Sequence, residues 1–255
     1  MANARLVYIA AVVAAVLVHA TVAHADGALD MAWADCVGDA APVRNLASAC
    51  GSNTGSQTLV CSLVAPTGIG HFGGIEIFID LISQATPLPA WWGFYNAGAC
   101  RQTSLAINTS YAGGGVGCSN PWMAAPALGA IAGYGSTGAP LPTIQAGNRS
   151  QYATIDAALA VTPGSEFPLT PGAQYFLANV TIDNARSTGV GSCAGCADPV
   201  CLSFTRVSLF QPGVPDVYIS TPGTLSLVTW QGAGANCSAV PVRRTTWGAI
   251  KSLYR

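Results

Sequence analysis

The sequence predicts an all-β protein, a Greek-key or jelly-roll-like β-sandwich with long loops that is stapled by disulfides. Three observations predict this. Several runs alternate apolar and polar residues with a period of two, which is the pattern of half-buried strands. Gly and Pro clusters separate these runs, and no run has the spacing of a long globular helix. Nine cysteines in a chain of 255 residues follow a leader-like N-terminus, as in disulfide-rich secreted proteins.

The clearest strand pair lies in residues 169–210. Residues 173–183 alternate apolar and polar side chains after a Pro-Gly turn, and residues 199–210 form the second strand. In that second strand two apolar residues share the inward face, but the next inward position falls on Arg206 and the apolar phase resumes at Val207. This slip predicts a β-bulge near Thr205 and Arg206, where one extra residue re-aims the side chains.

About seven to nine strands are predicted in all. Residues 26–56 are expected to be rich in loops, and residues 113–147 to form a long loop with at most one short strand near Ile131. That second stretch is also the candidate boundary between two subdomains. A helix that turns Tyr152, Ile155 and Leu159 inward is the alternative for one strand. The remaining strands are expected at residues 57–64, 73–81, 104–108, 153–161, 217–219 and 224–230.

The two ends of the chain differ from the rest. Residues 1–25 combine Arg5, an apolar run and an Ala-x-Ala site, which predicts a signal peptide and a mature chain without a transmembrane span. We expect one β-sandwich domain over residues 26–240. Residues 241–255 are basic and carry apolar residues at helical spacing, and we expect either a passive chain end or a basic amphipathic tail.

Composition excludes several classes of function. Charged residues make up only 8% of the chain, and nine basic against eleven acidic residues after the leader leave no electrostatic footprint for nucleic acid. His71 is the only histidine beyond the leader, so a multi-histidine metal site cannot form. No cofactor or metal is predicted. The low charge suits a protein that packs against itself, a polymer or a cell surface.

The cysteines are predicted to form disulfides, because all nine follow the leader. Nine is odd, so at least one thiol is free or pairs with another chain. A zinc site built from the cluster at 193–201 and Cys237 is the alternative, but the spacing lacks paired C-x₂-C motifs. Cys100 and Cys118 flank a short predicted strand and are expected to bridge. The disulfide candidates are Cys36, Cys50, Cys61, Cys100, Cys118, Cys193, Cys196, Cys201 and Cys237.

Four aromatic residues in Pro- and Gly-rich loops are the candidate ligand-binding residues, since an exposed ring can stack on a sugar. They are Trp91, Trp92, Tyr95 and Trp122. Packing within the loops is the alternative for all four.

No catalytic residue is assigned. A secreted hydrolase that uses Glu76, Asp80 or His71 is the alternative function. Glu76 and Asp80 share one face of a predicted strand, but four residues of strand separate them by roughly 13 Å. Paired glycosidase carboxylates lie about 5–9.5 Å apart, so these two are not a ready-made pair.

The strand pattern of residues 169–182, closed by residues 223–232, loosely resembles bacterial secreted cohesin-like and carbohydrate-module β-sandwich domains over about a quarter of the chain. The resemblance implies recognition of partner proteins or polysaccharides. We therefore predict a non-catalytic secreted or cell-surface protein that binds a glycan or a protein partner, or that self-associates. A periplasmic location is compatible with the same pattern.

Overall fold

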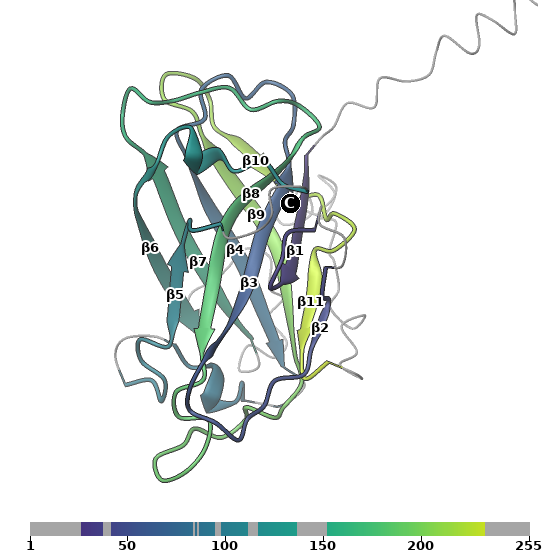
Figure 1. The fold of residues 1–255 in the computed structure, drawn as a ribbon, viewed down its shortest axis with the longest axis vertical. Helices are drawn as coiled ribbons and strands as arrows, with labels where there is room; N and C mark the ends of the chain where they lie inside the picture. Colours follow the sequence, from purple (N-terminus) through teal and green to yellow (C-terminus); the bar gives the residue numbers. More distant parts are fainter. Residues whose placement is uncertain are drawn as a thin grey trace, which may run out of the picture.

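The computed structural model describes residues 27–37, 42–83, 85, 87–94, 98–111, 117–136 and 152–232. The structure is nearly all β, with 44% strand and 4% helix, and two sheets pack face to face as a sandwich (Figure 1). The predicted fold class is therefore confirmed. The leader and the tail lie outside the described residues, and the domain boundaries stay a prediction.

Sheet A contains four antiparallel strands. Its outer edge at β1 is covered by the segment around Gly223. The backbone N–H of Leu29 donates to the carbonyl of Thr221, and the N–H of Gly223 donates to the carbonyl of Leu29. Covering an edge in this way removes a template for pairing with another chain. In spatial order the strands are β1 (Ala28–Trp33), β3 (Ser56–Val64), β8 (Gln174–Asp183) and β5 (Leu105–Asn108).

Sheet B contains seven strands and forms the second layer (Figure 1). β9 is its longest strand, and it pairs with β4 on one edge and with both β10 and β11 on the other. In spatial order the strands are β2 (Asn45–Leu46), β11 (Leu227–Trp230), β9 (Val200–Phe210), β4 (Gly74–Ser83), β7 (Tyr152–Val161) and β6 (Ala127–Ser136), with β10 (Val217–Ile219) beside β9.

The core lies between the sheets and follows the predicted alternation. On β4 the four inward side chains have no exposed surface, while the polar ones point to the outer face. β7 is a strand that pairs with β4 over nine positions, so the helical alternative for that segment was wrong. The inward residues of β4 are Ile75, Ile77, Ile79 and Leu81.

Two strands, β1 and β2, were not predicted, and a third, β6, is much longer than expected. β1 lies in the segment expected to be loops. The pattern missed it because Asp30 interrupts its apolar run, although that side chain is buried and only 3% exposed. β6 has ten residues, far more than the short strand expected near Ile131. Its glycines and alanines have low intrinsic preference for strands, and pairing with β7 supplies the context that makes it one.

The disulfides join distant parts of the chain. Cys36 pairs with Cys118 and Cys100 pairs with Cys193, so the expected bridge between Cys100 and Cys118 was wrong. The third bond joins Cys50 to Cys196. Bonds that close such long loops each stabilise a fold by roughly 2–5 kcal/mol.

The cluster at 193–201 is fully engaged, as predicted, because Cys201 is disulfide-bonded as well. These bonds take up the thiolates that a zinc ion would need. Pairing with Cys237, which lies outside the described residues, stays a prediction for Cys201. Cys61 is a free, fully buried thiol, so the prediction that it forms a disulfide was wrong, whereas the expectation of at least one unpaired cysteine is confirmed.

None of the helices in the described part of the chain has the length and apolar composition needed to cross a membrane.

Candidate functional site

The aromatic residues predicted to bind a ligand do not form one exposed strip. Trp91 and Trp92 lie in the short 3₁₀ helix η1 (Ala90–Trp92) at the lower end of the sandwich. Trp122 lies in η2 (Pro121–Met123) at the upper end (Figure 1). Trp91 and Trp92 have no exposed surface and Trp122 is 5% exposed. A buried ring has no face free to stack on a sugar. Tyr95 lies outside the described residues.

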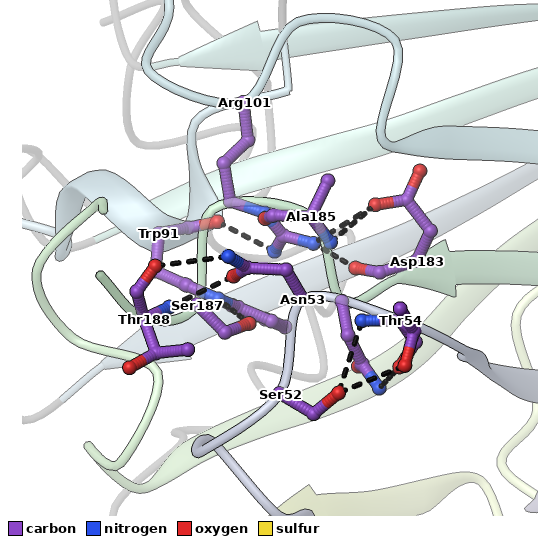
Figure 2. A network of polar contacts seen from close by, with 10 residues as sticks. Ser52, Asn53, Thr54, Trp91, Arg101, Asp183, Ala185, Ser187 and Thr188 are labelled. Atoms are coloured by element: carbon purple, nitrogen blue, oxygen red, sulfur yellow. Dashed lines mark hydrogen bonds and ion pairs between the residues drawn. The ribbon is translucent and has the colours of Figure 1, made fainter. Parts of the chain in front are cut away.

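Trp91 instead supports a buried cation. The Arg101 guanidinium lies 3.5 Å from the centre of the Trp91 ring and donates hydrogen bonds to three backbone carbonyls, those of Trp91, Asp183 and Ala185 (Figure 2). The Asp183 carboxylate forms an ion pair with it at 3.7 Å. Burial lowers the pKa of Arg101 to about 10, and Asp183 opposes that shift, so the side chain is charged at neutral pH.

This arrangement fixes the loop between β8 and β9. The Trp91 indole donates to Ser187 in that loop at 2.9 Å, and Asn53 exchanges two hydrogen bonds with the backbone of Thr188 (Figure 2). Two of the disulfides anchor the same loop. The lower end of the sandwich is therefore a structural clamp, and its tryptophans are part of the core.

The outer face of sheet B carries a different set of side chains. Glu76 and Asp80 share this face of β4, and the register of β4 with β7 places Phe78 directly opposite Asp156. Asp156 is therefore the diagonal neighbour of both Glu76 and Asp80. Diagonal neighbours lie about 7–8 Å apart. Glu76 and Asp80 are too far apart to act as a pair, but each of them has Asp156 as a nearby carboxylate.

The predicted bulge places a cation among these acids. β9 pairs Phe204 with Ile79 and Arg206 with Phe78, so Thr205 is the extra residue and the bulge prediction is confirmed. Because of that residue, Arg206 points outward while Val207 resumes the inward phase with no exposed surface. The Arg206 guanidinium lies 3.7 Å from the centre of the Phe78 ring.

We call this set of residues the polar face. It occupies three neighbouring strands of sheet B, and its members are Glu76, Phe78, Asp80, Thr154, Asp156, Arg206 and Ser208.

Hydrogen bonding on the polar face is incomplete. Thr154 donates to Asp80 at 2.7 Å and Ser208 donates to Glu76 at 3.4 Å. The Nε atom of Arg206 is buried and has no hydrogen-bond partner. Among the described residues the single ion pair within 4 Å is at Arg101, so Arg206 is near carboxylates without being paired to one.

Burial perturbs two of the carboxyl groups. It raises the pKa of Asp80, and the hydrogen bond from Thr154 opposes the shift. Burial, followed by the neighbouring Glu76 carboxylate, raises the pKa of Asp156, while Arg206 opposes it. Such shifts cost stability, and residues that keep them often serve a functional site.

His71 does not join this group. It is exposed in the turn that precedes β4, where its backbone N–H donates to the side chain of Gln211 at 3.3 Å. The described residues contain no group of three or more His, Cys, Asp or Glu side chains suited to hold a metal ion.

A scan of protein-family models finds no match to the chain, and a comparison with curated proteins finds no significant match either.

Proposed function

We propose that this protein is a non-catalytic, extracellular binding protein whose polar face recognises a neutral glycan. The observation that carries the proposal is the bulge at Thr205, which places Arg206 on the same face as Glu76, Asp80 and Asp156 while its Nε has no hydrogen-bond partner. The disulfide-rich sandwich fits an extracellular or periplasmic protein.

The chemistry of the polar face suits sugar hydroxyls. Carboxylates accept hydrogen bonds and a guanidinium donates them, while each hydroxyl of a sugar does both. Four of the 21 charged residues of the chain gather here. Three carboxylates against one guanidinium disfavour a polyanionic ligand, which leaves neutral glycans as the fitting class.

Native affinity electrophoresis in gels that contain starch, xylan, β-glucan or galactomannan tests the proposal. We expect one of these polysaccharides to retard the protein, and Arg206→Met and Asp156→Asn to weaken the retardation at least tenfold, since each removes a charged hydrogen-bonding group. Arg44→Met is the matched control, because Arg44 directly precedes β2 and its side chain donates only to the carbonyl of Thr224. Equal retardation of all variants would refute the proposal. Binding of a protein partner through the same residues, without binding of any glycan, would show that the ligand is a protein and would refute the glycan assignment.

Hydrolysis is the second candidate function. Asp156 with its raised pKa is suited to act as the acid, and Glu76 is the second carboxylate, on the diagonal position of β4, where residues of neighbouring strands lie about 7–8 Å apart. Release of reducing ends from the same polysaccharides, abolished in Asp156→Asn while retardation persists, would favour the enzyme over the binding protein.

A further inference from the structure

A groove on the outer face of sheet A contains one buried carboxylate. Its volume is about 530 Å³, within the about 300–1,000 Å³ that small-molecule sites usually have. Sheet A's outer face is opposite the polar face, so the groove is independent of the function proposed above. Its walls are formed mainly by Ala28, Val37, Val64 and Pro222, and its polar side chains include Asp30 and Gln174.

The position of Asp30 follows from the register of β1. Asp30 pairs with Ser62 and Ala28 pairs with Val64, so Asp30 points away from the core and into the groove. Its side chain is nevertheless only 3% exposed. The segment at Gly223 packs directly on it, and a Cβ atom at that glycine would lie 2.2 Å from Asp30 Oδ1.

Within the part of the chain that the structure describes, the Asp30 carboxylate has a hydrogen-bond donor but no paired cation. Oδ1 accepts a hydrogen bond from the backbone N–H of Leu225 at 2.8 Å. Among the described residues, no cationic side chain lies within 4 Å of it. A carboxylate can accept about four hydrogen bonds, and a buried charge is costly unless a cation or several donors compensate it.

Gln174, which also lines the groove, favours a ligand that donates hydrogen bonds. Gln174 donates its Nε2 to Ser62 at 2.8 Å, which leaves the amide oxygen able to accept. Two acceptors beside aliphatic walls match a group that carries N–H donors and a positive charge on a hydrocarbon stem.

We propose that this groove binds an alkylammonium group, with the nitrogen at Asp30 and the alkyl chain against Ala28, Val64 and Pro222. The same chemistry occurs in a free amine and in the lysine side chain of a partner protein.

Titration of the ¹⁵N-labelled protein with hexylammonium, followed by NMR, tests the site. We expect the Leu225 amide signal to shift at about 10 mM probe, because that amide donates to Asp30. Hexanol, the neutral analogue, should bind at least tenfold more weakly. A wild-type amide that does not respond, or hexanol that binds as well as hexylammonium, would overturn the proposal.

Three variants separate binding from folding. Asp30→Asn keeps an acceptor for Leu225 but removes the charge, and we expect at least tenfold weaker binding. Thr224→Trp blocks the groove from its exposed rim without touching the core, with the same expected loss. Asp198→Asn removes an exposed carboxylate elsewhere and should bind like the wild type. Unchanged affinity in Asp30→Asn would overturn the proposal, even if Thr224→Trp bound more weakly.

A second probe identifies the source of the ammonium group. A short peptide with one internal lysine that binds at least as tightly as hexylammonium indicates a protein partner, whereas weaker binding of the peptide indicates a small free amine. Failure of both probes refutes the site.

Discussion

Replacement of Arg101 by methionine tests the clamp at the lower end of the sandwich. Methionine retains most of the side-chain volume but supplies no donor and no charge. Three backbone carbonyls then lose their hydrogen bonds, and the Trp91 ring loses the cation above it. The loop between β8 and β9 loses the link to η1 that runs through Arg101, while the hydrogen bonds from Trp91 to Ser187 and Ala194 remain.

The magnitude follows from the exposure of each partner. The bond to the Trp91 carbonyl is buried, so its loss costs about 1–3 kcal/mol. The carbonyls of Asp183 and Ala185 are only partly buried and can recruit water, which reduces their share. The desolvated cation–π contact adds about 2 kcal/mol. Relief of the cost of burying the guanidinium offsets part of this sum, and we expect a net loss of about 3–5 kcal/mol.

Urea unfolding with the disulfides intact, followed by tryptophan fluorescence, measures the effect. Arg186→Met is the matched control, because Arg186 lies in the same loop, is exposed and donates only to the Cys100 carbonyl at 3.0 Å. The control should lose less than about 1 kcal/mol. If Arg101→Met unfolds within about 1 kcal/mol of the wild type, or no more easily than the control, the clamp does not stabilise the fold as argued.

Four shorter predictions address other parts of the molecule. The Cys61 thiol should resist alkylation at pH 8 until the protein unfolds, because burial raises its pKa and the thiolate is the nucleophile; labelling of the native protein at the unfolded rate would contradict this. Gly195→Ala should cost about 2–4 kcal/mol in urea, since its φ is +102° and a Cβ would lie 2.1 Å from a proline side chain, whereas Gly164→Ala, in open space at φ +85°, should cost only about 1 kcal/mol. Asp156 has a raised pKa in the folded state, so the wild type should lose stability relative to Asp156→Asn as the pH rises from about 4 toward neutrality, and parallel pH profiles would refute that reasoning. Deletion of Thr205 should remove the bulge at a cost of about 1 kcal/mol, and because Phe204, Arg206 and Val207 then alternate inward, outward and inward as in a regular strand, Arg206 should stay on the polar face and glycan retardation should persist; loss of retardation in a folded variant would show that the bulge itself, and not only the outward Arg206, is needed for binding.

The strands that alternation predicted are the ones whose two faces have different environments. β3, β4, β7 and β8 each bury one face completely, so their inward positions must be apolar and the period of two is visible in the sequence. The same pattern does not predict β1, because the segment at Gly223 covers its outer face as well and buries Asp30 there. A strand buried on both faces has no polar alternation to detect.

The pairing of the cysteines was harder to predict from the sequence than the strands were. The expected bridge between Cys100 and Cys118 assumed that cysteines close in sequence are close in space, whereas the observed bonds span 82, 146 and 93 residues. Their partners meet only after strands from both sheets have been placed. Tryptophan burial has the same origin, since the β8–β9 loop and Arg101 cover the short helix that carries Trp91.

The arrangement of side chains on the polar face depends on the register between strands, which the sequence alone does not predict. Glu76, Asp80 and Asp156 are each predicted on outward positions of their strands, yet the sequence does not say which residue of β7 lies opposite which residue of β4. A shift of one residue in that pairing would turn every side chain of β7 to the other face. The register that buries Ile155 opposite Ile79 is the one that sets Asp156 opposite Phe78. Packing of the core therefore determines the geometry of the acids on the opposite face, and the extra residue in β9 adds the cation without disturbing that packing.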